Sequence, residues 1–220
     1  PFLTAAPANH DAALADPRRP AEDRARDAFR RPAEMLAFAE IGPGDKVGEM
    51  LPGGGYFTRI FAVAVTPGGR LYPTIRPEAT VGEYETPILA VAAQYPESVT
   101  MARSPYDALA YPEPLDVIFT AQNYHDMHIA QYNLGDVNAA NRSAFAALKP
   151  GGFYIVIDHA AAPGMPMEEA LAIHRIDQAQ VIREVEAAGF VLDAESEALR
   201  NPADTRTLNV FDPAIRGQTD

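Results

Sequence analysis

The sequence has no cysteine, few basic residues relative to acidic ones, and no apolar run of the length that a membrane span needs. Without cysteine the chain forms no disulfide, no thiolate metal site and no cysteine nucleophile. The 18 basic residues against 30 acidic ones give a formal charge of −12, which repels a phosphate backbone. We therefore expect neither a nucleic-acid partner nor a membrane span.

The rest of the composition is that of an ordinary globular protein. Apolar residues make up 47% of the 220 residues and charged residues 22%, and this length suits a single α/β domain. We expect an Ala/Pro-rich N-terminal arm over 1–19 and one domain over 20–220. The chain starts at Pro1, so two compartments remain possible: the cytoplasm or, if a signal peptide was removed, the periplasm. Formation of a homo-oligomer is also possible.

Apolar runs alternate with amphipathic segments, which predicts a doubly wound, mostly parallel sheet with helices on both faces. Pro32 divides the first amphipathic stretch, 20–40. The predicted strands are Lys46–Leu51, Arg70–Ile75, Val99–Ala102, Leu115–Thr120, Phe153–Asp158 and Phe190–Ser196, with a weak candidate at Thr207–Phe211. The later predicted helices are Tyr56–Val65, Gly82–Gln94, Val137–Leu148 and Glu168–Ala188. In such sheets ligands bind beyond the carboxyl ends of the strands.

Three consecutive glycines, Gly53, Gly54 and Gly55, separate the first predicted strand from the helix that follows it. Glycine lets the backbone approach a ligand closely, and a helix start offers free N–H groups to a carboxylate or phosphate. A nucleotide-like cofactor is the natural occupant of such a loop, although glycines also serve packing in strand-to-helix turns. Glu49, near the end of the strand, is expected to brace the loop.

Histidine and aspartate side chains gather in the segments expected near the carboxyl ends of the strands. They are His125, His128, His159 and His174, with Asp126, Asp158 and Asp177 each within three residues of a histidine. Histidine titrates near neutral pH, and a neighbouring carboxylate raises its basicity, so the group is typical of an acid–base centre. His174 and Asp177 share one face of the predicted last helix.

Other roles for these polar residues remain open. Imidazole and carboxylate groups also suit zinc, iron or manganese, but no His-x-x-x-His pair is present, so a divalent metal is the less favoured interpretation. Tyr56 and Tyr124 are candidates to orient a phenolic or acidic substrate, and Arg76 to hold a substrate carboxylate. The alternative is that these three side chains belong to the core or to the solvated surface.

The order of the motifs resembles that of class I S-adenosylmethionine-dependent methyltransferases, which implies a Rossmann-like fold and this cofactor. The likeness rests on the glycine loop, on a strand that starts at Asp116 and on the turn Leu148-Lys-Pro-Gly-Gly152. More narrowly, Gln122-Asn-Tyr-His-Asp-Met-His128 and His174-Arg-Ile-Asp177 are similar to a family of predicted bacterial methyltransferases, which are often exported.

The chain departs from the superfamily pattern at two positions. Carried over by position, the acidic-x-Gly-x-Gly-x-Gly motif falls on Glu49, Leu51, Gly53 and Gly55, so leucine replaces the first glycine. The superfamily places a ribose-binding acidic residue at the end of the second strand, but Arg76 stands there in this chain. These departures imply that the cofactor is bound weakly, bound in a different arrangement, or not used.

The resemblance implies methyl transfer to an oxygen or nitrogen atom of a small aromatic or acidic metabolite. Asn123 and Tyr124 occupy the place of an Asn-Pro-Pro-aromatic motif but lack its prolines, which favours a small molecule over a nucleobase. Asn123 and the glycines would approach the cofactor, while His125 or His128, supported by Asp126, removes the acceptor's proton. The alternative is a lyase or isomerase without this cofactor, for example in retro-aldol release of an aldehyde, and a third interpretation is a binding protein.

Overall fold

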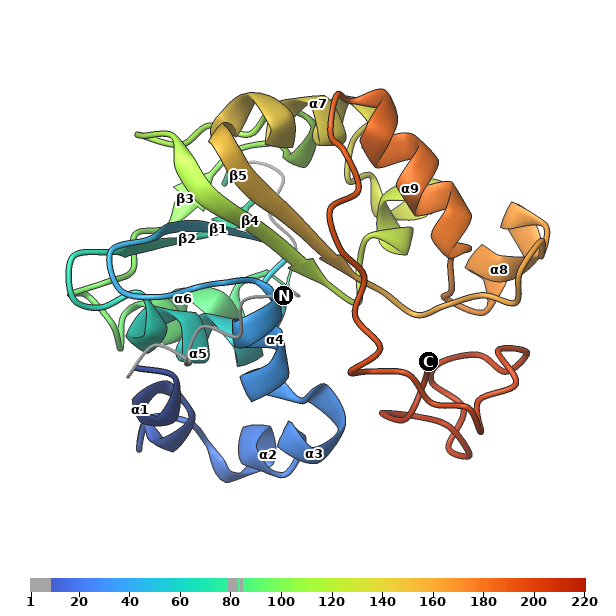
Figure 1. Cartoon of the computed structure of the whole chain (residues 1–220), viewed down its shortest axis with the longest axis horizontal. Coiled ribbons are helices and arrows are strands. Elements are labelled where there is room, and N and C mark those ends of the chain that lie inside the picture. Colours follow the sequence, from blue (N-terminus) through green and yellow to red (C-terminus); the bar gives the residue numbers. More distant parts are fainter. Residues whose placement is uncertain (1–8, 79–82, 84) are drawn as a thin grey trace.

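The computed structural model describes residues 9–78, 83 and 85–220. In this part of the chain a five-stranded, fully parallel sheet has the strand order β3-β2-β1-β4-β5. Its strands are β1 (Lys46–Met50), β2 (Arg70–Ile75), β3 (Ala102–Arg103), β4 (Leu115–Ala121) and β5 (Leu148–Ile157). Helices cover both faces of the sheet (Figure 1), which confirms the doubly wound architecture. None of the described helices combines the length and apolar character that crossing a bilayer requires.

One helical layer lies below the sheet in Figure 1. It contains α1 (Asn9–Ala15), α4 (Pro32–Phe38), α5 (Tyr56–Ala64) and α6 (Pro87–Ala92), with the single-turn helices α2 (Ala21–Arg24) and α3 (Asp27–Arg30) between α1 and α4. Pro32 begins α4, where its missing N–H is not needed. Phe57 and Phe61 of α5 pack on Phe119 of β4, with ring centroids 4.9 and 4.8 Å away, and so join α5 to the sheet.

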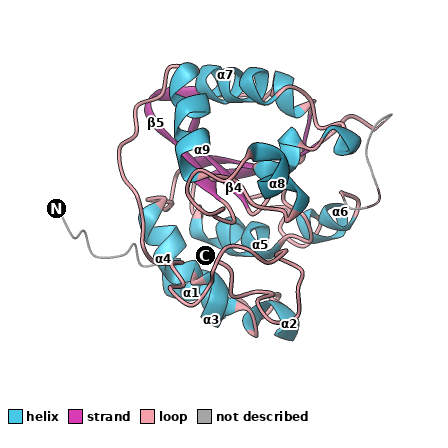
Figure 2. Ribbon diagram, turned by 90° about the vertical axis from the view of Figure 1, so that its right-hand side faces the viewer, coloured by secondary structure: helices cyan, strands magenta, loops and turns pink. Residues whose placement is uncertain are grey.

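The second layer contains α7 (Val137–Ala147) and α9 (Gln178–Ala187), both of which are labelled in Figure 2. The 3₁₀ turn η1 (Tyr106–Ala108) packs beside α7. Ile118 and Leu115 of β4 and Ala144 of α7 are fully buried in the core beneath this layer. Asp136 caps the start of α7 by accepting a hydrogen bond from the backbone N of Ala139 at 2.7 Å. The central strands β1, β2 and β4 are therefore buried between two apolar layers, as their continuous apolar sequences require.

Part of the predicted N-terminal arm, 1–19, is helical. Ala13 of α1 is fully buried, and His10 donates a hydrogen bond from Nε2 to the carbonyl oxygen of Ile41 at 2.7 Å. Residues 1–8 lie outside the described part. Helix α1 therefore packs on the rest of the chain, while the division into an arm and a domain over 20–220 stays a prediction.

Two predicted strands near the C-terminus were wrong. Phe190–Ser196 and Thr207–Phe211 are irregular, and β5 forms the edge of the described sheet. Val191 and Leu192 are exposed rather than buried. The physical reason is that only three consecutive apolar residues precede the polar stretch that starts at Asp193, which is too short a run for a strand covered on both faces.

The predicted long helix Glu168–Ala188 was also wrong, because it is broken into α8 (Met167–Ala172) and α9. Between them His174 adopts a left-handed backbone conformation with φ of +56°, and Ile176 pairs with Ala160 in a parallel bridge. Arg175 is buried in an ion pair with Asp204, with Nη1 and Oδ2 at 2.8 Å. This long-range pair and bridge fix a non-helical connection.

Three further boundaries shift, and one of them is the start of β5, which lies at Leu148 rather than at the predicted Phe153. Helix α6 begins at Pro87, whereas the predicted helix began at Gly82, which lies outside the described residues. The third strand is shorter and later than predicted: β3 covers Ala102–Arg103, and Val99 makes only an isolated bridge to Leu71.

Candidate functional site

The glycine loop lies between β1 and α5, at the carboxyl edge of the sheet. Leu51, at the place of the first motif glycine, has φ of +51°, so the backbone keeps a conformation that glycine adopts more easily. A Cβ atom on Gly53 or Gly54 would meet no other atom within 4 Å. On Gly55 it would lie 2.9 Å from Val91 of α6. The first two glycines therefore border open space, whereas the third allows α5 and α6 to pack closely.

Glu49 ties β1 to the start of α5. Its side chain is buried, and Thr58 donates a hydrogen bond from Oγ1 to Glu49 Oε2 at 2.6 Å. Burial raises the pKa of Glu49 to about 8, against the opposing effect of the bond from Thr58 and the charge of Arg30. The carboxyl group is therefore mostly protonated near neutral pH and contacts the helix, which suits the expected bracing role.

Asn123 joins the loop after β4 to the glycine loop. It donates from Nδ2 to the carbonyl oxygen of Leu51 at 2.7 Å, while its Oδ1 accepts a hydrogen bond from Thr120. Both ends of the amide therefore have protein partners. We expected Asn123 to contact the cofactor. In the structure its side chain instead holds the two loops together.

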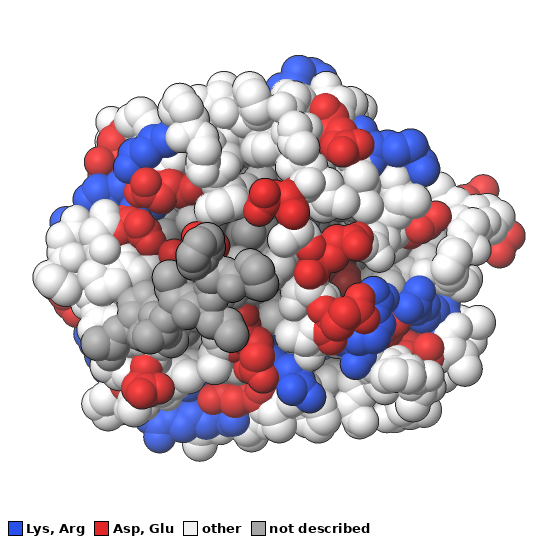
Figure 3. Space-filling model, viewed as in Figure 1, with Lys and Arg blue, Asp and Glu red and all other residues white. Residues whose placement is uncertain are grey.

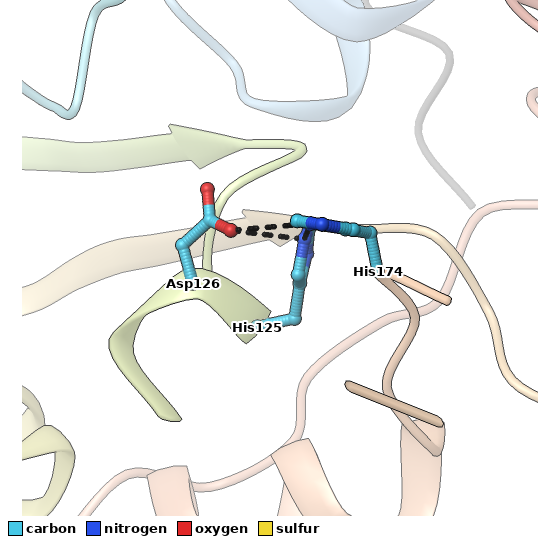
Figure 4. Close-up of side chains that lie close together, drawn as sticks. All are labelled: His125, Asp126 and His174. Carbon is cyan, nitrogen blue, oxygen red and sulfur yellow. Dashed lines mark hydrogen bonds and ion pairs between the residues drawn. The ribbon is translucent and has the colours of Figure 1, made fainter. Parts of the chain in front are cut away.

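Four predicted side chains converge beyond the ends of β4 and β5. His125, in the 3₁₀ turn η2 (His125–His128), donates from Nδ1 to Asp158 Oδ1 at 2.8 Å. Its Nε2 atom lies 3.1 Å from Asp126 Oδ1 and 3.3 Å from His174 Nδ1. Figure 4 shows that Asp126 and His174 approach from opposite sides and point toward each other at one end of the His125 ring. We call His125, Asp126, Asp158 and His174 the imidazole–carboxylate cluster.

The charges of the cluster are strongly coupled. Burial would lower the pKa of His125, but hydrogen bonds to Asp126 and Asp158 outweigh it and raise the pKa to about 10. Burial would raise the pKa of Asp158, whereas its bond with His125 holds it below the usual range. The ring is therefore protonated near neutral pH and donates from both nitrogens, which differs from the expected role of a general base.

The other two predicted catalytic histidines have separate partners. His159 has Nδ1 at 2.6 Å from Oγ1 of Thr219, and its ring centre is 6.0 Å from that of His125. Burial lowers the pKa of His159 to about 4, so its ring is neutral. His128 donates from Nε2 to Glu184 of α9 at 3.0 Å. The four predicted histidines therefore do not form one group. His128 anchors α9 and does not belong to the cluster.

The three predicted substrate-binding side chains bond within the protein. The hydroxyl of Tyr124 donates to Glu184 at 2.9 Å, and that of Tyr56 donates to Asp27 at 2.6 Å. Both tyrosine rings are buried. Arg76 forms an ion pair with Glu85, with Nη2 and Oε2 at 2.7 Å. This geometry does not support the expected substrate contacts for these residues, because their polar groups have partners already.

Arg30 of α3 lies beside the candidate site, and the sequence did not single it out. Its guanidinium lies 4.6 Å from the ring centre of Tyr56, and Nη2 donates to Gln122, at the end of β4. It forms no ion pair with any carboxylate in the described part of the chain. Burial lowers the pKa of Arg30 to about 10, which leaves it charged at neutral pH. The only signal in the sequence was a segment, 18–31, that holds six arginines.

No family model matches the chain, and neither does any curated protein. Solved structures do resemble it. A SAM-dependent methyltransferase from Aquifex aeolicus is 18% identical, with a TM-score of 0.60, over 80% of this chain and 90% of that one. A chain of the complex between the Haloferax volcanii Trm112 methyltransferase activator and a methyltransferase is 18% identical, with a TM-score of 0.57, over 86% and 79%.

The [4+2]-cyclase SpnF is similar as well, at 17% identity and a TM-score of 0.53, over 77% of this chain and 57% of that one. At such identities the likeness concerns the fold, which these proteins use for different reactions. The narrower resemblance to one bacterial family stays a prediction. The chain has the Rossmann-like class I methyltransferase fold.

Proposed function

We propose that the chain transfers a methyl group from S-adenosylmethionine to an oxygen or nitrogen atom of a small acidic or aromatic metabolite. The observation that carries this proposal is the bond from Asn123 to Leu51, which holds the open glycine loop beside the loop of the imidazole–carboxylate cluster. Both loops follow neighbouring parallel strands, β1 and β4, at the edge where such sheets bind ligands.

The residues present fit the cofactor at the glycine loop. Gly53 and Gly54 leave room for a ligand against the backbone, and Leu51 preserves the left-handed turn despite its side chain. The carboxylate of Glu85 lies at the end of β2, where it accepts a hydrogen bond from the backbone N of Arg76 at 3.0 Å. Both oxygen atoms of this carboxylate already have protein partners, in the ion pair with Arg76 and in the bond from the hydroxyl of Tyr106 at 3.0 Å, so it is not a free acidic group that replaces the superfamily's ribose-binding residue.

When bound, the cofactor supplies an electrophilic methyl group. The chain's own residues then have three tasks, of which the first is to bind the cofactor against Gly53 and Gly54. The cluster around His125 faces the acceptor and takes part in holding its reactive atom. Arg30, a cation without a carboxylate partner in the described residues, supports an acidic acceptor, since guanidinium binds carboxylates through paired hydrogen bonds.

Calorimetric titration with S-adenosylmethionine tests the cofactor site, with Gly53→Ala as the variant. A Cβ atom there would enter the proposed ligand space, and crowding of about 1–3 kcal/mol corresponds to roughly 5–150-fold weaker binding. Gly151→Ala is the matched control, since Gly151 also has a left-handed φ, of +82°, and open space, but lies near the opposite edge of the sheet. Equal affinity of the two variants, or no heat with the wild type, would refute the proposal.

A further inference from the structure

Three donor atoms of the imidazole–carboxylate cluster face one another: His125 Nε2, His174 Nδ1 and Asp126 Oδ1. The His125 atom lies 3.3 Å from the His174 atom and 3.1 Å from the Asp126 atom, and the last two are 3.7 Å apart. One point about 2.0 Å from all three atoms satisfies these separations, and bonds from zinc to imidazole and carboxylate are about 2.0–2.2 Å long. We propose that His125, His174 and Asp126 bind a divalent transition-metal ion.

Asp158 provides the support that a histidine ligand needs. Its Oδ1 accepts from His125 Nδ1 at 2.8 Å, and its Oδ2 accepts from the backbone N of His125 at 2.6 Å. The backbone N of His159 also donates to Oδ1, at 2.8 Å. The carboxylate is thus fixed, and it fixes the ring so that Nε2 is directed at the other two donors. Histidines that bind metals commonly have such a carboxylate on the second ring nitrogen.

Charge and access also favour a cation at this place. Asp126 and Asp158 bring two carboxylates to the cluster, the chain carries a formal charge of −12, and acidic side chains are spread over the face drawn in Figure 3. The side chains of Asp126 and His174 are 26% and 19% exposed, so an ion can reach them from solvent. Nitrogen and oxygen donors without thiolate suit zinc, iron or manganese.

Three protein ligands leave a coordination position open, as in catalytic zinc sites. In a bound ion that position would take an oxygen atom of the acceptor, and coordination would lower the pKa of that oxygen, so that its proton would pass to solvent without a free histidine base. This role rests on the proposed methyl transfer, because the acceptor atom must then face the glycine loop. The metal site itself depends only on the four cluster residues.

The test uses protein dialysed against a chelator and titrated calorimetrically with zinc chloride, without S-adenosylmethionine. We expect one zinc ion per chain. His174→Asn removes a ligand while tolerating the left-handed backbone, and should weaken zinc binding at least about 100-fold. Asp158→Asn should weaken it about 10–100-fold through the ring of His125. His128→Gln, in the same turn but bonded to Glu184, should bind zinc like the wild type.

Far-UV circular dichroism of each variant establishes that it is folded, and Asp126→Asn is a second, isosteric ligand variant. Failure of the folded wild type to bind zinc, or unchanged affinity in His174→Asn and Asp126→Asn, would overturn the metal site. A parallel titration of the chelated protein with S-adenosylmethionine keeps the two proposals apart. Zinc binding without cofactor binding supports the site and removes its role in methyl transfer, whereas cofactor binding without zinc binding overturns the site alone.

Discussion

The side-chain amide of Asn123 donates a hydrogen bond to the carbonyl oxygen of Leu51 at 2.7 Å, across two loops that follow adjacent strands. The loop of Leu51 carries the open glycines, and the loop of Asn123 leads into His125. Thr120 holds the other end of the amide. One amide group therefore links the proposed cofactor site to the imidazole–carboxylate cluster.

Replacing Asn123 by leucine should weaken both stability and cofactor binding. The change leaves the Leu51 carbonyl and the Thr120 hydroxyl without their partner, which costs about 1–3 kcal/mol when such groups are buried. We expect a lower midpoint in urea unfolding and at least about fivefold weaker S-adenosylmethionine binding by calorimetry. Asn138→Leu, on an exposed position of α7, is the control. Unaltered affinity in Asn123→Leu would show that the link does not position the glycine loop.

Glu49 should make the protein less stable as the pH rises. Its pKa in the folded protein, about 8, lies above the ordinary value of 4.5, so the folded state holds the proton more tightly. The stability that this group contributes is complete below about pH 4.5 and is lost as the pH rises through about 8, by at most about 1.4 kcal/mol per pH unit.

Glu49→Gln removes this titration while keeping an oxygen for the bond from Thr58. Urea unfolding at about pH 5, 6.5 and 8 should therefore show that the variant gains stability relative to the wild type as the pH increases. Glu186→Gln, at an exposed position of α9, should show no such trend. A constant difference between Glu49→Gln and the wild type would mean that the carboxyl group ionises normally.

The ion pair between Arg175 and Asp204 should be essential for the C-terminal segment. Both side chains are almost fully buried, and removal of one partner of a buried pair costs about 3–5 kcal/mol. Asp204→Ala should therefore lower the free energy of unfolding by this amount and expose the segment after 197 to proteolysis. Glu197→Ala removes an exposed pair with Arg200 and should leave the free energy of unfolding nearly unchanged. Similar losses in the two variants would contradict the structural role of the buried pair.

Arg30 should determine affinity for acidic ligands. Arg30→Met keeps much of the contact with Tyr56 but removes the charge, and loss of a charge-assisted hydrogen bond costs about 1.5–3 kcal/mol. With salicylate as a probe that carries a phenol and a carboxylate, we expect roughly tenfold or greater weakening by NMR titration. Arg31→Met, at the next and exposed residue, should bind like the wild type. Equal binding by all three proteins would remove Arg30 from substrate recognition.

Sequence patterns located the central strands because buried parallel strands are continuous apolar runs. Strands β1, β2 and β4 appear close to their predicted bounds. The break at His174 could not be predicted, since it depends on Arg175 meeting Asp204, 29 residues away in the chain. The missing strand at Phe190–Ser196 shows the opposite error, in which a short apolar run was taken for an edge strand.

The topology of a parallel sheet explains why part of the site was predictable. His125 and Asp158 follow neighbouring strands, so their meeting at one edge could be expected. Residue types did not reveal which histidines would share a partner. His128 is three residues from His125, but the turn directs it to Glu184 of α9, and only the packing of that helix decides this.

A crystal structure of the protein with S-adenosylhomocysteine would test the central claim most directly. We expect density for the ligand against the backbone of Gly53 and Gly54, with its sulfur atom on the side of the His125 loop. Density at another place, or an empty glycine loop in crystals saturated with the ligand, would contradict the account.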